Sequence, residues 1–146
     1  MKALVVVFFY FLMEADETRK YSKCELYEEL TKHGLDGYTG IGVGHWICLI
    51  LFGSGYDTEY YKFSDGHPYY GLFHLSGLKW CSNGRHPSEN LCKIDCDNFL
   101  DDNISDDVEC AKKVAASKGG MMSWKHFGEY CTHPMPEIVF WECKTE

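Results

Sequence analysis

The chain has 146 residues, eight of them cysteines, and a formal net charge of −8 at pH 7. The length suits a single domain. The negative charge and the lack of a basic cluster with interleaved aromatic residues argue against binding to nucleic acid or to an anionic membrane surface. Eight cysteines in so short a chain indicate four disulfides and an oxidising compartment, whereas a zinc site would need Cys-x-x-Cys pairs, which the sequence lacks.

The first 15 residues are typical of a signal peptide. Lys2 supplies a positive charge, and the apolar run Ala3–Met13 is too short to span a bilayer. Ala15 offers a small residue before the cleavage point. A buried core strand is the alternative, but the run starts at the initiator methionine. We therefore expect a secreted monomer with a domain over residues 16–146 and no membrane segment.

Two helices are predicted next. Cys24–Lys32 places Leu26, Tyr27 and Leu30 on one face. His45–Phe52 is apolar almost throughout, as a buried helix would be.

A small β region should follow. Residues 59–63 and 69–75 are rich in aromatic residues and predict two strands, and residues 64–68 between them are turn formers. Beyond a cysteine-tied loop, Ser105 is a predicted N-cap for a helix over 106–116, and apolar residues recur at helical spacing over 121–131.

The segment from Cys92 to Cys110 carries six aspartates and Glu109. Their mutual repulsion would be offset by a hard cation such as Ca²⁺, which takes six to eight oxygen ligands. The alternative is an acidic helix start, where the helix dipole favours negative charge. No glycine lies between the two cysteines, so the segment is not an EF-hand loop.

The order Cys92-x3-Cys96, Phe99, Asn103-Ile104 and Cys110 resembles the pattern of c-type lysozymes and alpha-lactalbumins. The resemblance covers about residues 20 to 146 and implies an α+β fold, with a helical lobe, a small antiparallel β lobe and a calcium loop between them. It also implies the disulfides Cys24–Cys143, Cys48–Cys131, Cys81–Cys96 and Cys92–Cys110.

The same resemblance implies a Ca²⁺ site. Its side-chain ligands would be Asp101, Asp106 and Asp107, and its main-chain carbonyl ligands would be Asn98 and Asn103. Asn103 also begins an N-x-S glycosylation sequon. A glycan there would crowd the calcium loop, so we expect Asn103 to be mostly unmodified.

Hydrolysis in this family needs two carboxylates about 5 Å apart. The family's acid stands five residues after the second cysteine, which is Gly53 here, and the second carboxylate precedes Tyr70-Gly71, where Tyr69 stands. Neither residue can do this chemistry at pH 7, so we expect no enzymatic activity.

The other positions of the cleft that bear on function are the nearby acids and the residues that would contact a sugar. The nearby acids Asp57, Glu59 and Asp65 would have to reach a site set by other backbone positions. The resemblance further implies that His74, Ser76 and Lys79 replace sugar-contacting residues, whereas Trp80 and Trp124 remain at positions that match cleft tryptophans.

The implied function is that of a calcium-binding, non-catalytic regulator similar to alpha-lactalbumin. Such proteins bind a β-1,4-galactosyltransferase and turn its acceptor preference toward glucose, which gives lactose. The matching contact residues are Leu51, Phe52, Phe140 and Trp141, of which only Trp141 keeps its identity. The alternatives are a lysozyme-like glycoside hydrolase and a glycan-binding protein that uses the old cleft weakly.

Overall fold

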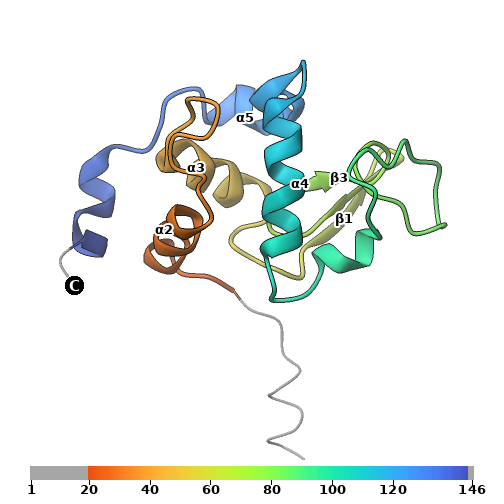
Figure 1. Ribbon diagram of the computed structural model, residues 1–146, viewed down its shortest axis with the longest axis horizontal. Helices are drawn as coiled ribbons and strands as arrows, with labels where there is room; N and C mark the ends of the chain where they lie inside the picture. The colour runs from red at the N-terminus through yellow and green to blue at the C-terminus, as the bar shows by residue number, and fades with distance from the viewer. Residues whose placement is uncertain (1–19, 145–146) are drawn as a thin grey trace, which may run out of the picture.

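The computed structural model describes residues 20–144, apart from the side chains of Glu137 and Ile138. A helical lobe and a small β lobe lie side by side, with helix α4 between the sheet and the first two helices (Figure 1). The predicted signal peptide lies outside the described residues. Among those residues, no helix is both long and apolar enough to cross a membrane.

The helical elements are short and follow the apolar patterns of the sequence. In chain order they are the α-helices α2 (Lys23–Lys32), α3 (Val43–Gly53), α4 (Ser105–Ala116) and α5 (Lys125–Tyr130), and the 3-10 helices η1 (Cys96–Phe99), η2 (Gly120–Ser123) and η3 (Glu137–Lys144).

Two helix predictions are corrected by the structure. Ser105 is the first residue of α4 and Ile104 is its N-cap, because the backbone N–H of Ser105 donates to Asn103 Oδ1 (3.1 Å). The predicted helix over 121–131 is divided into η2 and α5, because Trp124 between them is extended, with φ −93° and ψ 113°. The apolar residues Met121, Trp124 and Phe127 are nevertheless all buried, as helical spacing suggested.

The sheet has three antiparallel strands, β1 (Tyr61–Ser64), β2 (His67–Tyr70) and β3 (Leu75–Ser76), in the order β1-β2-β3. Asp65 and Gly66 join β1 to β2 and both have positive φ, as a tight type I′ hairpin turn requires. The predicted strand over 69–75 is wrong in its middle. Gly71 adopts φ +77°, which ends β2 and turns the chain back into β3.

The hydrophobic core joins the two lobes. Trp46 of α3 meets the rings of Phe73 and Trp124 edge-on, at centroid distances of 6.0 Å and 5.9 Å. Helix α5 packs on α3, and η3 packs on α2. All four disulfides pair as the family resemblance implied, so the α+β prediction and the cysteine framework are confirmed.

Candidate ligand cleft and calcium loop

A cleft of about 850 Å³ lies between the β lobe and the segment 119–129. One wall comes from the β1–β2 hairpin and the chain that follows it as far as Trp80. The other wall comes from η2 and α5. The cleft therefore depends on the packing of α5 against α3, which no local sequence pattern specifies.

Three aromatic rings of the cleft lining form one cluster, those of Tyr69, His74 and His126, which we call the cleft floor. The Tyr69 ring stacks on His74 with centroids 4.2 Å apart, and the His126 ring meets His74 nearly at right angles at 5.0 Å. Gly53, the last residue of α3, lies against both histidines. A Cβ atom at Gly53 would stand 2.9 Å from His74 Cβ and 3.1 Å from His126 Nε2. The two histidines thus occupy the space that a side chain at position 53 would need.

Both histidines are neutral near pH 7. Burial, followed by the nearby His126 and Lys62, lowers the pKa of His74 to about 4. Burial likewise lowers the pKa of His126. Because a carbonyl only accepts, the 2.9 Å contact between His126 Nε2 and Leu49 O is a hydrogen bond that the imidazole donates. That bond fixes the tautomer and leaves Nδ1 unprotonated.

The candidate substitute carboxylates are not gathered at this floor. Asp57 Oδ1 accepts the backbone N–H of Glu59 (2.9 Å), outside the cleft lining. Asp65 does line the cleft, from the hairpin turn. Glu129 of α5 lines it too and was missed from the sequence, because nothing local marks an exposed helical glutamate as a cleft residue.

The two cleft tryptophans contribute little accessible ring surface. Trp80 is 5% exposed and Trp124 is 4% exposed, and Trp124 Nε1 donates to Phe73 O (2.7 Å). The Lys79 ammonium lies over the Trp80 ring, 5.2 Å from its centroid. Both indoles line the cleft but serve mainly as core.

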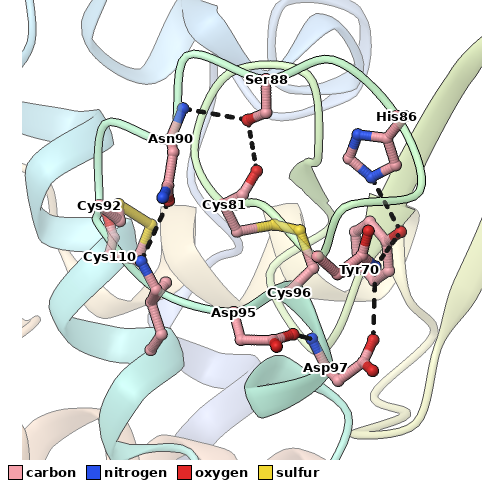
Figure 2. The surroundings of a disulfide bond; sticks show 12 residues. Tyr70, Cys81, His86, Ser88, Asn90, Cys92, Asp95, Cys96, Asp97 and Cys110 are labelled. Atoms are coloured by element: carbon pink, nitrogen blue, oxygen red, sulfur yellow. Dashed lines mark hydrogen bonds between the residues drawn. A yellow bond between two sulfur atoms is a disulfide. The ribbon is translucent and has the colours of Figure 1, made fainter.

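A loop over residues 81–96, closed by a disulfide, connects the cleft to the acidic segment (Figure 2). Ser88 Oγ donates to Cys81 O and accepts the backbone N–H of Asn90, whose side-chain oxygen accepts the N–H of Ile94 (3.1 Å). The disulfide Cys81–Cys96 closes the loop. These bonds, together with the disulfide that joins Cys92 to α4, order the chain on the N-terminal side of the predicted Ca²⁺ ligands.

Asp107 is the one buried carboxylate of the described residues. It is 1% exposed, and neither of its oxygens has a hydrogen-bond partner. Its pKa is raised to about 9, mainly by burial and to a lesser extent by the charges of Asp101 and Asp106, while the backbone amides of Asp107 and Leu72 act in the opposite direction. A buried carboxylate without a partner is costly, and a bound cation is the ordinary compensation.

The other predicted Ca²⁺ ligands are exposed: Asn98, Asp101, Asn103 and Asp106. Asp101 Oδ1 accepts the backbone N–H of Asn103 (3.1 Å), which holds the turn. Within residues 20–144, no three His, Cys, Asp or Glu side chains converge into a group that could hold a metal ion. The set fits Ca²⁺ in its donor chemistry and in the buried, unpartnered oxygens of Asp107, and the exposed carboxylates would have to rotate inward to complete the site. The sequon prediction for Asn103 stays a prediction.

Of the four predicted partner-contact residues, three are at least partly exposed and one is buried. Phe52 is 50% exposed and stacks on Tyr130 of α5 at 4.7 Å, beside the half-buried Leu51. Trp141 is 67% exposed on η3, which packs on α2. Phe140 is only 3% exposed and stacks on Tyr27 at 5.3 Å, so this residue is core.

A family model described as the C-type lysozyme/alpha-lactalbumin family matches residues 19–143. The chain belongs to this family. It is 39% identical over 136 residues to sperm acrosome-associated protein 5 of Mus musculus, covering 92% of this chain and 85% of that protein. It is 37% identical over 133 residues to alpha-lactalbumin of Rattus norvegicus, covering 90% of this chain and 80% of that protein.

Among solved structures, a lysozyme from Equus asinus superposes with a TM-score of 0.81 at 34% identity, covering 86% of this chain and 99% of that one. The lysozyme-like fold and the family resemblance are thereby confirmed. Family membership alone leaves the activity open, because the family includes both lysozymes and alpha-lactalbumins.

Proposed function

We propose that this family member binds an oligosaccharide in its cleft and does not hydrolyse it. The observation that carries the proposal is the packing at Gly53, where His74 and His126 fill the space in which the family's acid would stand. Tyr69, at the second carboxylate position, stacks into the same cluster. Neutral imidazoles and a phenol can donate and accept hydrogen bonds to sugar hydroxyls, but they supply no general acid paired with a carboxylate.

Calcium would stabilise this binding protein. Asp101, Asp106 and Asp107 would supply carboxylate oxygens, and Asn98 and Asn103 would supply main-chain carbonyls. The buried, unpartnered Asp107 carboxylate supports the site. Ca²⁺ would neutralise the acidic loop and has no part in the chemistry of the cleft.

The same proposal places the protein in the secretory pathway. Four disulfides favour an oxidising compartment, and the proposed signal peptide would direct the chain there. Several of the relatives are named for the sperm acrosome, a location that secretory-pathway proteins reach. We therefore propose secretion or acrosomal storage in sperm.

Two assays on the calcium-loaded protein test this function. Calorimetric titration with a neutral chitin oligosaccharide and with acidic sugar oligomers should show binding of at least one of them at millimolar concentration or below. Lysis of a bacterial wall suspension should stay at the level of buffer. Binding of no oligosaccharide would reject the cleft function, and lysis that disappears on Asp65→Asn would show that a substitute carboxylate has kept the hydrolytic activity.

A second candidate is regulation of a β-1,4-galactosyltransferase, as in alpha-lactalbumin. The exposed Phe52–Tyr130 pair and the exposed Trp141 favour it, because exposed aromatic side chains commonly anchor protein interfaces. Lactose formation from UDP-galactose and glucose, measured with and without the protein, tests it. Stimulation that Trp141→Ala abolishes would support this candidate, and unchanged lactose formation would reject it.

A further inference from the structure

We propose that the ligand of the cleft is an anionic oligosaccharide, one that carries sulfate or carboxylate groups. This inference rests on the proposed glycan-binding function and names its substrate class. It follows from the uneven distribution of charge between the cleft and the rest of the molecule.

The cleft is positively charged in a negatively charged protein. Its lining includes Lys62, Lys79 and Lys125, against the two acids Asp65 and Glu129. The whole chain carries 22 acidic residues against 14 Lys and Arg, with a net charge of −8. The cleft thus holds three of the 14 cations and only two of the 22 anions, so its local charge has the opposite sign to that of the molecule.

These three lysines are not engaged by acids of the protein. In the part of the chain that the structure describes, the ion pairs of lysine involve Lys23, Lys32 and Lys112, and none involves a cleft lysine. All three cleft lysines are exposed. Lys79 lies over the Trp80 ring, which positions its ammonium without neutralising it. The cations are therefore available to a ligand.

The floor of the cleft carries no negative charge that would repel an anion. Gly53 and Tyr69 stand where the family resemblance places two carboxylates, and the floor now consists of Tyr69, His74 and His126. The imidazole Nδ1 of His126 is left free by the hydrogen bond that Nε2 makes to Leu49 O. Charge-assisted hydrogen bonds from the lysines to sulfate or carboxylate oxygens are stronger than neutral ones.

A nucleic acid is a less suitable polyanion. The cleft holds only three lysines, and the protein as a whole has a net charge of −8. A long polyanion would extend beyond the cleft over negatively charged surface and be repelled there, whereas a short oligosaccharide would contact only the cleft. Single-stranded DNA therefore serves as a control for non-specific attraction.

The test uses the calcium-loaded mature protein and three tetrasaccharides of matched length: neutral chitotetraose, a sulfated chitotetraose and a tetramer of a uronic acid. Calorimetry at 50 mM salt should show that at least one anionic sugar binds tenfold or more tightly than chitotetraose. At 500 mM salt the advantage should shrink several-fold because ions screen the lysines. The tighter of the two anionic sugars identifies the group that the cleft recognises.

Lysine variants locate the effect. Lys62→Gln and Lys79→Gln should each lower the affinity for the anionic sugar about five- to tenfold and leave the affinity for chitotetraose within twofold. Lys113→Gln, at an exposed position on α4 outside the cleft lining, is the matched control and should change neither affinity. Thermal unfolding of each variant checks that it is folded.

Three results would overturn the inference. Equal affinity for neutral and anionic sugars would remove the anionic preference but leave the proposed function standing. A DNA tetranucleotide that binds as tightly as the sulfated sugar would show non-specific attraction only. Failure of every sugar to bind folded protein would reject the proposed function and this inference together.

Discussion

The side chains around Gly53 decide what the cleft can do. Gly53 ends α3, and the Cβ of His74 and the Nε2 of His126 stand 2.9 Å and 3.1 Å from the place where its own Cβ would be. The family resemblance implies that a general acid would project from this same position. The two histidines leave no room for a glutamate there unless they move, since the space that it would use is already packed.

Restoring the two carboxylates should not restore hydrolysis. We expect Gly53→Glu combined with Tyr69→Asp to show no lysis of bacterial walls and to unfold at a lower temperature. Overpacking typically costs about 1–3 kcal/mol, which exceeds the helix-propensity gain of about 1 kcal/mol on replacing glycine. Turbidity assays and thermal unfolding measure both effects. Ala116→Glu, at an exposed position of α4, controls for added charge, and lysis by the double variant would show that the floor can rearrange.

His74 should make the free energy of unfolding fall as the pH is lowered. Its folded-state pKa of about 4 lies below the ordinary value of 6.5, so protons bind the unfolded state more readily. The resulting stability is complete above pH 6.5 and is lost as the pH falls toward 4. We expect wild-type protein to lose about 2 kcal/mol more than His74→Gln between pH 7 and pH 4, after allowance for solvent screening. Denaturant unfolding at both pH values measures this difference, and equal losses would contradict it.

At the scale of elements, Gly71 joins the β lobe to η1 and to the acidic start of α4, where we propose the Ca²⁺ site. It ends β2 with φ +77°, and a Cβ there would contact Phe99 O of η1 and stand 2.8 Å from Asp107 Oδ2 of α4. Only glycine allows three elements to approach so closely at this point. The Asp107 carboxylate is therefore placed at the junction of the two lobes.

Adding a methyl group at Gly71 should lower the free energy of unfolding far more than adding one in the β1–β2 hairpin turn. We expect Gly71→Ala to lose more than about 2 kcal/mol of unfolding free energy, through left-handed strain together with the clash, and to weaken Ca²⁺ binding. Gly66→Ala is a matched control, because Gly66 has φ +79° but nothing lies within 4 Å of its Cβ position. It should lose only about 1 kcal/mol and keep its Ca²⁺ affinity. Similar losses for the two variants, measured by denaturant unfolding, would disprove the close approach at Gly71.

At the scale of the whole molecule, the core and the disulfides hold the two lobes together, whereas the buried Asp107 carboxyl, whose oxygens have no hydrogen-bond partner, opposes folding. A bound cation would remove that cost. A ligand that binds only the folded state stabilises it by about 2.7 kcal/mol at a hundredfold excess over its dissociation constant. Calcium should therefore act on global stability and not merely on one loop.

We expect a chelator to lower the melting temperature of the wild-type protein, and we expect Asp106→Ala and Asp107→Asn to remove the difference between calcium and chelator. Asp107→Asn in chelator should melt no lower than the wild type in chelator, because it removes an unpartnered buried carboxylate. Scanning calorimetry gives both comparisons. A calcium shift that persists in Asp107→Asn would rule out the assigned ligands.

Sequence reasoning predicted the parts of the structure that local pattern determines, such as the apolar faces of α2 and α3. The four disulfide pairs were predicted only through the family resemblance, because the residues alone do not choose among the possible pairings. It missed two features that depend on side-chain hydrogen bonds. The N-cap of α4 shifted by one residue because Asn103, two positions earlier, accepts the N–H of Ser105. His126 enters the cleft floor through a hydrogen bond to Leu49, a contact between residues 77 positions apart.

The packing around Gly53 also limits which single substitutions can change the chemistry of the cleft. A single substitution of Gly53 by glutamate meets the Cβ of His74 and the ring of His126, and a single change of either histidine to a smaller residue leaves a void without adding any carboxylate. Each single step toward a pair of carboxylates in this cleft is thus unfavourable by itself, and only several changes made together would succeed. With His74 and His126 packed over this glycine, single substitutions can alter which ligand the cleft holds far more readily than they can introduce a hydrolytic pair of acids.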